Sequence, residues 1–189
     1  MIRALLFSLL VLPLHAQDGG KIADAARQQI GVTRSYDPAY TSIAYPNGDV
    51  PREKGVCTDV VIRALRDSLS LDLQKLVHED MKANFSKYPE TWGLSRTDRN
   101  IDHRRVPNLR RYFERKGYEI KLPATQDADV FSPGDLVTCT VAGKLPHIMI
   151  VSDRKTADGR PLMIHNIGGG AQEEDVLFAF PLTGHYRLK

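Results

Sequence analysis

The sequence predicts an α+β fold, with helices in the N-terminal part of the chain and an antiparallel sheet in the C-terminal part. Up to about residue 117, apolar residues recur at spacings of three and four, which is the period of helices that bury one face. From residue 118 onward, short β-rich runs alternate with turns. Helices first and strands afterwards is the order of an α+β domain.

The first sixteen residues differ in composition from the rest. Arg3 precedes an almost unbroken apolar run from Leu5 to Leu14, and a polar stretch begins at Gln17. This is the layout of a cleaved secretory signal, because the apolar run is too short to span a bilayer. We therefore expect a signal peptide over residues 1–16 and an exported single domain over 17–189, periplasmic or secreted, with no stable membrane insertion. An apolar N-terminal helix or anchor is the alternative.

Composition and charge restrict the partners. The chain is 42% apolar and 26% charged, which is ordinary for a globular domain. Its 26 Lys and Arg against 23 Asp and Glu give a net charge of +3, so we expect no nucleic-acid partner. The densest basic cluster, over 102–116, includes Arg104 and Arg105. A solvated helix face, a buried ion network and a clamp for a substrate anion all remain open for it.

Four helices are expected after the signal. Gly31 closes the first, and the second shows Val60, Val61, Ala64 and Leu65 on one face. The segment 35–55 is rich in Tyr, Pro, Gly and Asp, so we expect ordered irregular structure there, walling a site at the start of the second helix. The expected helical ranges are 21–30, 58–68, 72–84 and about 107–117.

The strands follow from alternation of apolar and polar residues. In the central hairpin, a loop over 152–160 would make His147 and His165 face each other on the same side of the sheet. The expected strands are 118–122, 134–141, 145–152, 162–167, 176–180 and 185–188.

Cys57 lies at the start of the second expected helix. Free backbone N–H groups and the positive end of the helix dipole stabilise a thiolate and can lower the pKa of a cysteine there. The same N–H groups can bind an oxyanion. Attack on an amide also needs a base and a group that orients it, and His147 and His165 supply both. Asn166, on the opposite face of the same strand, is the alternative orienting group, but the expected register favours His165.

Cys139 is the second of two cysteines, and in an exported protein the two could pair. Strand alternation places Cys139 on the face of Val137 and Val141, which is a core position. A buried free cysteine behaves as a small apolar residue, so two separate thiols are favoured.

The order of helix cysteine, strand histidine and next-strand polar residue resembles the NlpC-type and CHAP-type papain-like cysteine peptidases and amidases. The motifs are the Tyr- and Gly-containing segment from Tyr45 to Asp49 that precedes Cys57 at a helix start, the Gly134–Asp135 turn before a strand, the run from His147 to Val151, and the polar residue His165 on the next strand. The sequences of residues 76–81 and 100–108 also resemble an uncharacterised family of exported bacterial domains in the same superfamily. The resemblance implies a papain-like fold, with the nucleophile helix packed on a C-terminal antiparallel sheet.

The resemblance implies hydrolysis of an amide bond through a thioester, in cell-wall (peptidoglycan) peptides. It also places Tyr45 beside the thiol, binding oxyanion or substrate. Val56 stands where NlpC-type enzymes usually have an aspartate that receives a free amine, and Asp59 is a candidate substrate contact nearby. Specificity for the usual peptides is therefore open.

No His-Glu-x-x-His or paired Cys-x-x-Cys spacing is present, so we expect no metal and no cofactor. Two other functions use the same residues. One is an envelope-binding module that keeps the pocket without hydrolysis and holds an anion through the basic cluster. The other is acyl or peptidyl transfer to an amine instead of water.

Overall fold

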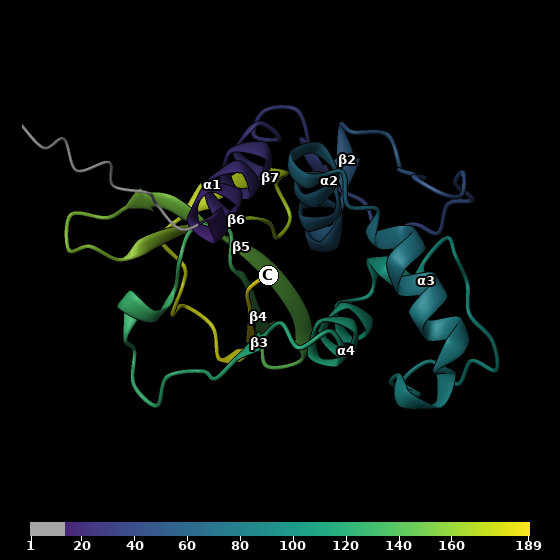
Figure 1. Ribbon diagram of the computed structural model, residues 1–189. Coiled ribbons are helices and arrows are strands. Elements are labelled where there is room, and N and C mark those ends of the chain that lie inside the picture. Colours follow the sequence, from purple (N-terminus) through teal and green to yellow (C-terminus); the bar gives the residue numbers. More distant parts are fainter. Residues whose placement is uncertain (1–13) are drawn as a thin grey trace, which may run out of the picture.

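A six-stranded antiparallel sheet, in the order β3-β8-β4-β5-β6-β7, forms the centre of the molecule (Figure 1). The computed structural model describes residues 14–189. A separate parallel pair, β1 (Ser35–Tyr36) with β2 (Lys54–Gly55), brackets the irregular segment before the second helix. The strands of the sheet are β3 (Glu119–Ile120), β4 (Leu136–Val141), β5 (Leu145–Lys155), β6 (Pro161–Asn166), β7 (Ala171–Glu174) and β8 (Leu182–Tyr186).

The helices precede the sheet, which confirms the α+β prediction. Helices α1 and α2 lie together over one face of the sheet, and α3 lies beyond α2 and α4, away from the sheet (Figure 1). Asp72 caps α3 by accepting hydrogen bonds from two backbone N–H groups. The helices are α1 (Leu14–Arg27), α2 (Cys57–Leu69), α3 (Leu73–Ala83) and α4 (Val106–Arg115), with 3₁₀ turns η1 (Phe85–Lys87), η2 (Asp102–Arg104) and η3 (Ala128–Val130).

The expected signal peptide falls mostly on residues 1–13, which lie outside the described part of the chain. Helix α1 begins at Leu14, earlier than the expected start at residue 21. Within the described residues, no helix combines the length and the apolar character needed to cross a membrane.

The two faces of the sheet carry different cores. On the helix side, Ile148, Ile150 and Ile164 pack with Cys57 and the apolar side of α2. On the far side, Met149, Val151 and Met163 pack with Cys139 under segments that contain no long helix. Both cysteines are free and buried, one in each core, which agrees with two separate thiols.

The register of the central hairpin differs from the expected one by two residues. Ile150 faces Ile164, whereas Lys155 faces Pro161, so a bulge in β5 shifts the pairing between these points. His147 and His165 are therefore diagonal neighbours rather than facing ones. They remain on the same face, because a shift of two residues preserves the alternation.

The last part of the sheet differs from expectation for a physical reason. The apolar run 176–180 is a turn, not a strand, and its Val176 and Phe178 cover the far-side core. The strand is instead β7, an edge strand of sequence AQEE. An edge strand exposes one side to water, so it needs no apolar alternation and gave no pattern to detect.

Arg63 of α2 orders the irregular segment that leads into Cys57. Its side chain is fully buried, and it binds the Asp49 carboxylate at 3.0 Å together with the carbonyl oxygens of Val50 and Lys54. A buried guanidinium with five donors is stable only where acceptors surround it. The segment is thus ordered and irregular, as expected.

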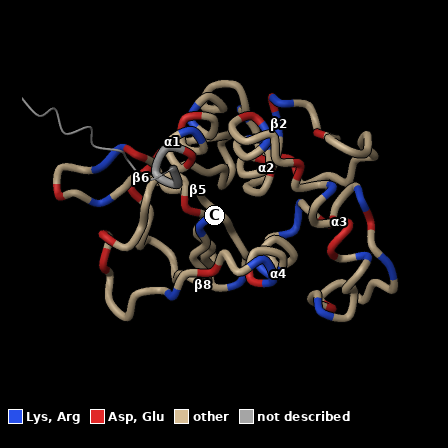
Figure 2. Tube along the Cα trace, viewed as in Figure 1, with Lys and Arg blue, Asp and Glu red and all other residues tan. Residues whose placement is uncertain are grey.

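Acidic and basic residues are interspersed along the whole trace (Figure 2). Many form local pairs, such as Arg52 with Asp67 at 2.7 Å and Arg160 with Asp175 at 2.6 Å. The small net charge therefore reflects neutralisation over the described surface rather than two opposed charged faces.

Candidate active site

The start of α2 holds Cys57 through a capping arrangement. Val56, the N-cap residue, is extended, and its N–H donates to Oδ2 of Asp59 at 2.6 Å. Asp59 in turn accepts two hydrogen bonds of 2.9 Å from the buried Arg104. A Cβ at Gly55 would lie 2.9 Å from that carboxylate, so this approach requires glycine. Asp59 therefore shapes the nucleophile turn, and its carboxylate is occupied within the fold.

The thiol of Cys57 is enclosed, since the residue is 4% exposed. Burial raises the pKa of Cys57 to about 11, and hydrogen bonds from the backbone N–H groups of Ile148, Thr58 and Cys57 itself oppose this rise. The depressed pKa expected at a helix start is thus not present in the substrate-free protein, because desolvation outweighs the helix terminus.

Tyr36, not Tyr45, lies beside the thiol. Burial and the neighbouring Cys57, which also hydrogen-bonds the hydroxyl, raise the pKa of Tyr36 to about 12. Tyr45 lies at α3, its ring 5.4 Å from that of His78 in an edge arrangement. Three tyrosines, at 36, 40 and 45, share the irregular segment, and no local pattern distinguishes the one that returns to α2.

A chain of hydrogen bonds connects β5, β6 and β7. Nε2 of His147 lies 2.9 Å from Nδ1 of His165, and Nε2 of His165 lies 3.1 Å from a carboxylate oxygen of Glu174. His147 and His165 are 4% and 1% exposed, whereas the Glu174 side chain is 42% exposed. The chain thus leads from a buried imidazole to a carboxylate at the surface.

The carboxylate defines the tautomers of both rings. Glu174 can only accept when ionised, so Nε2 of His165 carries a proton and Nδ1 of His165 is an acceptor. Nε2 of His147 must then donate to it, which leaves Nδ1 of His147 unprotonated. Within residues 14–189 that nitrogen makes no hydrogen bond. It is the atom available to take a proton from a nucleophile.

Both rings are neutral at ordinary pH. Burial, reinforced by the neighbouring His165, lowers the pKa of His147 to about 3. Burial also lowers the pKa of His165, although Glu174 acts in the opposite direction. The substrate-free site therefore holds a thiol and two neutral imidazoles rather than an ion pair.

Cys57 and the two imidazoles lie on different faces of the sheet. Cys139 pairs with His147, and alternation turns both toward the far face, whereas Cys57 belongs to the helix-side core. The point of contact is the backbone N–H of Ile148, the residue after His147. The described residues show no hydrogen bond from the thiol to either ring.

Asn166 has a different task from that of His165. Its Nδ2 donates to the carbonyl oxygens of Gly55 and Ser35, and its Oδ1 accepts from the N–H groups of Gly168 and Gly170. These four bonds hold the loop after β6 against the approach to α2. Asn166 is saturated by them, and it is His165 that contacts His147.

The two arginines of the basic cluster behave differently. Arg104 is buried in the ion pair with Asp59 and is therefore part of an internal network rather than an anion clamp. Arg105 lies over the ring of Trp92, with its guanidinium carbon 4.1 Å from the ring centre.

Tyr36 and Glu174 are site residues that the sequence did not predict. Glu174 could have been found only by recognising strand β7, because the pairing of β6 with β7 brings Glu174 diagonal to His165.

The described residues contain no group of three or more His, Cys, Asp or Glu side chains placed to hold a metal ion. The site is built instead from a thiol, two imidazoles and a carboxylate.

A cysteine at the start of the helix that covers an antiparallel sheet, with histidines on the central strands, is the plan of the papain-like NlpC and amidase fold. Two crystal structures of an N-acetylmuramoyl-L-alanine amidase from Bacteroides uniformis share the fold, each with a TM-score of 0.53, at 12% and 13% identity, over 92% of this chain and 100% of theirs. NlpC1 from Trichomonas vaginalis has a TM-score of 0.45 at 14% identity. The match covers 90% of this chain and 44% of the NlpC1 chain.

The chain belongs to the family described as "Domain of unknown function (DUF1287)", which it matches over residues 23–188. One relative in this comparison is the Uncharacterized protein YijF of Escherichia coli (strain K12). It is 55% identical over 177 residues, which cover 94% of this chain and 85% of the relative.

Proposed function

We propose that this protein is a thiol hydrolase that cleaves amide bonds. The observation that carries the proposal is the hydrogen-bonded series His147–His165–Glu174, which leaves one imidazole nitrogen free at the strand that also contacts the Cys57 thiol. A thiol and an oriented base are the requirements for nucleophilic attack on a carbonyl. The likeness of fold to an amidase supports this class of reaction.

The steps follow from the protonation states. Substrate entry brings Sγ of Cys57 toward Nδ1 of His147, and the thiol proton moves to that nitrogen as the S–C bond forms. Because burial raises the pKa of the thiol and lowers that of the imidazole, the transfer occurs together with attack rather than before it. His165 accepts a hydrogen bond from the resulting imidazolium, and Glu174 stabilises that charge.

The carbonyl oxygen becomes an oxyanion beside donors at the start of α2. We assign this role to the backbone N–H of Cys57 and the hydroxyl of Tyr36, since both hydrogen-bond the thiol in this structure. Collapse of the intermediate breaks the C–N bond, and the departing amine takes the proton from His147. Water, deprotonated by the same imidazole, then hydrolyses the thioester and regenerates the thiol.

We further propose that the amide lies in peptidoglycan peptides and that the protein acts after export, in the periplasm or outside the cell. The B. uniformis neighbour that shares the fold is named an N-acetylmuramoyl-L-alanine amidase. The apolar run before residue 16 has the composition of a secretory signal. The signal would then direct the protein to the compartment that contains its peptidoglycan substrate.

The test is incubation of the purified protein, without residues 1–16, with peptidoglycan sacculi, followed by mass spectrometry of the soluble products. We expect new fragments with one water added at the cut amide. Cys57→Ala should lower the rate by about 10³-fold or more. Cys139→Ala is the matched control, since Cys139 lies in the far-side core, and it should keep most of the activity.

Intact sacculi after incubation with active-site-titrated protein would contradict the proposed substrate. Fragments that form equally fast with Cys57→Ala would contradict the nucleophile. Products joined to an added amine, instead of water, would assign the protein to transfer.

A second candidate, an envelope-binding module without hydrolysis, is favoured by the enclosed, neutral thiol. Alkylation of Cys57 with iodoacetamide, measured from pH 6 to 10, distinguishes the two. Without ligand, the rate should rise with pH through this range, because only the thiolate reacts. A substrate peptide should leave a covalent acyl adduct on Cys57 of a hydrolase, detectable by mass spectrometry of the intact protein, whereas a binding module should show only protection from alkylation.

A further inference from the structure

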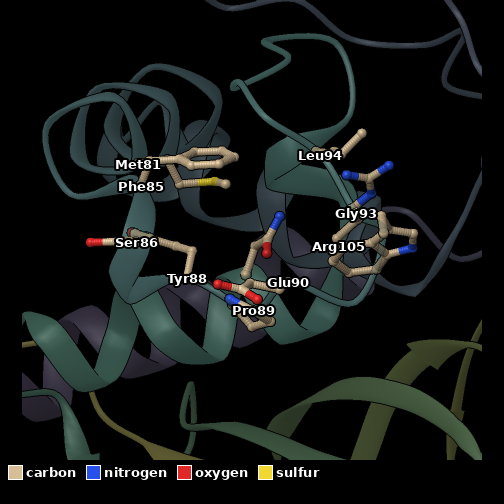
Figure 3. A pocket seen from close by; sticks show the side chains of 11 residues that line it. Met81, Phe85, Ser86, Tyr88, Pro89, Glu90, Gly93, Leu94 and Arg105 are labelled. Carbon is tan, nitrogen blue, oxygen red and sulfur yellow. The ribbon is translucent and has the colours of Figure 1, made fainter.

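A second pocket lies at the ends of α3 and α4. Its volume is about 290 Å³, the lower end of the range for small-molecule sites, and none of its lining residues belongs to the Cys57 site. Met81 and Phe85 lie on one side of it and Arg105 on the other, with Tyr88 and Glu90 between them (Figure 3). The walls are thus mainly aromatic and apolar, with a few polar groups.

One buried acceptor lines this pocket without a partner. Asn108 is 1% exposed, and its Nδ2 donates to the carbonyl oxygen of Asp102 at 3.0 Å. That bond fixes the orientation of the amide, so Oδ1 is the atom left over. Within residues 14–189, this oxygen has no hydrogen-bonding partner. An unsatisfied buried acceptor is destabilising, and a ligand with a suitable N–H would supply the missing hydrogen bond.

A buried donor accompanies it. Nη1 of Arg105 is buried and makes no hydrogen bond with any described residue, and the nearest carboxylate oxygen recorded, Oδ1 of Asp102, is 3.8 Å away. The flat guanidinium is held over the ring of Trp92, which limits its movement. The pocket therefore presents one fixed acceptor and one fixed donor, surrounded by apolar side chains.

We propose that this pocket binds the acetamido group of an N-acetylated sugar. An acetamido group offers an N–H to Asn108 and a C=O to Arg105 at once, and its methyl group suits the apolar walls. A simple anion would leave the oxygen of Asn108 unpaired and face it with like partial charge.

The rim of the pocket favours a sugar over a peptide. Ser86 and Glu90 are exposed there and can bond ring hydroxyls, and Trp92 offers an apolar edge to the ring carbons. A peptide amide would satisfy Asn108 and Arg105 but would leave the rim groups without use. This site extends the protein's function beyond the amide cleavage proposed above and does not depend on it.

The test uses the single tryptophan of the chain, Trp92, whose indole N–H gives one signal in a ¹H–¹⁵N spectrum. The full domain carrying Cys57→Ala is titrated with N,N′-diacetylchitobiose, so that turnover plays no part. Cellobiose, which has the same linked rings with hydroxyls in place of the acetamido groups, is the matched ligand control. We expect a saturable shift with the first sugar and none with the second.

Arg105→Gln replaces the charged donor with a shorter, neutral amide and should weaken binding about tenfold, because hydrogen bonds to charged groups are the stronger kind. Arg111→Gln is the matched protein control, since Arg111 is exposed on the same helix and paired with Glu114. Equal melting temperatures of the two variants would verify that both fold.

The proposal is overturned if cellobiose shifts the indole signal as strongly, if N-acetylalanine methylamide binds more tightly than the sugar, or if no compound shifts it. Unchanged affinity of Arg105→Gln would also overturn it. Failure of Cys57-dependent hydrolysis would affect only the proposed function, since this titration uses protein that lacks the nucleophile.

Discussion

Two buried histidine networks lie on the far face of the same sheet, and they differ in whether the carboxylate that ends the network is exposed or buried. In one, His147 and His165 lead to the half-exposed Glu174. In the other, His185 lies 2.6 Å from the fully buried Asp135, which Arg187 also binds at 2.7 Å. Both contain an imidazole bonded toward a carboxylate, and both leave one Nδ1 without a hydrogen bond among the described residues, but only His147 belongs to the strand whose backbone contacts the Cys57 thiol.

The difference distinguishes the Asp135 network, which stabilises the fold, from the His147 network, for which we propose a role in proton transfer. Burial acts to raise the pKa of Asp135, but Arg187 and His185 together hold that pKa below its usual value. Its charge is satisfied internally, so the network ties β4 to β8. In the His147 network the carboxylate reaches water while the imidazoles stay neutral, so a proton that arrives can be stabilised without a permanent internal cation.

The largest expected contrast is in activity. His147→Asn should lower kcat/KM for amide cleavage by about 10³-fold, because general acid–base catalysis typically contributes 10²- to 10⁴-fold. His185→Asn should leave the rate per folded molecule unchanged within about twofold. Rates corrected for active protein by thiol titration check this pair. Equal losses in the two variants would break the comparison.

The second contrast is in stability. Asp135→Ala leaves His185 and Arg187 without their acceptor and should lower the free energy of unfolding by about 2–4 kcal/mol, since breaking a buried pair is costly but Arg187 can reach water. Glu174→Ala, at the exposed end of the other network, should cost less than about 1 kcal/mol. Urea denaturation of both variants measures this. A larger loss for Glu174→Ala would reverse the assignment of roles.

The pH dependence of stability sharpens the comparison further. The folded protein holds His147 with a pKa of about 3, below the value of about 6.5 in an unfolded chain, so between these values the unfolded state binds more protons. Stability should therefore fall as pH drops below about 6.5, by about 1.4 kcal/mol per pH unit for this group. His147→Asn should flatten the slope of unfolding free energy against pH from 6 to 4. An unchanged slope would contradict a buried neutral His147.

The smallest expected effect concerns Glu174, the exposed end of the series His147–His165–Glu174. Glu174→Gln keeps an acceptor for His165 but removes the charge, and we expect kcat/KM to fall about tenfold. Since Glu174 raises the pKa of His165, its neutralisation should also move the acid limb of the pH–rate profile to lower pH. Glu119→Gln, on the exposed strand β3, is the control. A purely structural role would lower the rate without shifting the limb.

Local periodicity was sufficient to predict the helix that begins at Cys57 and the strands of His147 and His165. These elements are amphipathic, and their patterns survive in the sequence because burial of one face stabilises them. The contact between the two histidines was predicted correctly although the register was not. A bulge in β5 moved the pairing by two residues, and alternation tolerates that displacement.

What could not be predicted depends on contacts far apart in the chain. The path from Tyr36 to Cys57 is set by the buried side chain of Arg63, not by turn residues within the segment, so the choice between Tyr36 and Tyr45 had no local signal. Glu174 lies on an edge strand that lacks apolar alternation. The expected lowering of the Cys57 pKa failed because burial, a tertiary property, outweighs the helix terminus.

Arg63 holds the approach to the nucleophile largely through main-chain oxygens, at Val50, Lys54 and, at 3.4 Å, Arg52. A carbonyl oxygen is the same for every residue type, so apart from the ion pair with Asp49 these contacts do not depend on which side chains residues 50–54 carry. Positions 50–54 can therefore exchange side chains, and with them the surface offered to an incoming substrate, while the turn that presents Cys57 keeps its course. A single buried cation of the helix thus sets the course of a segment whose outward side chains it does not bind.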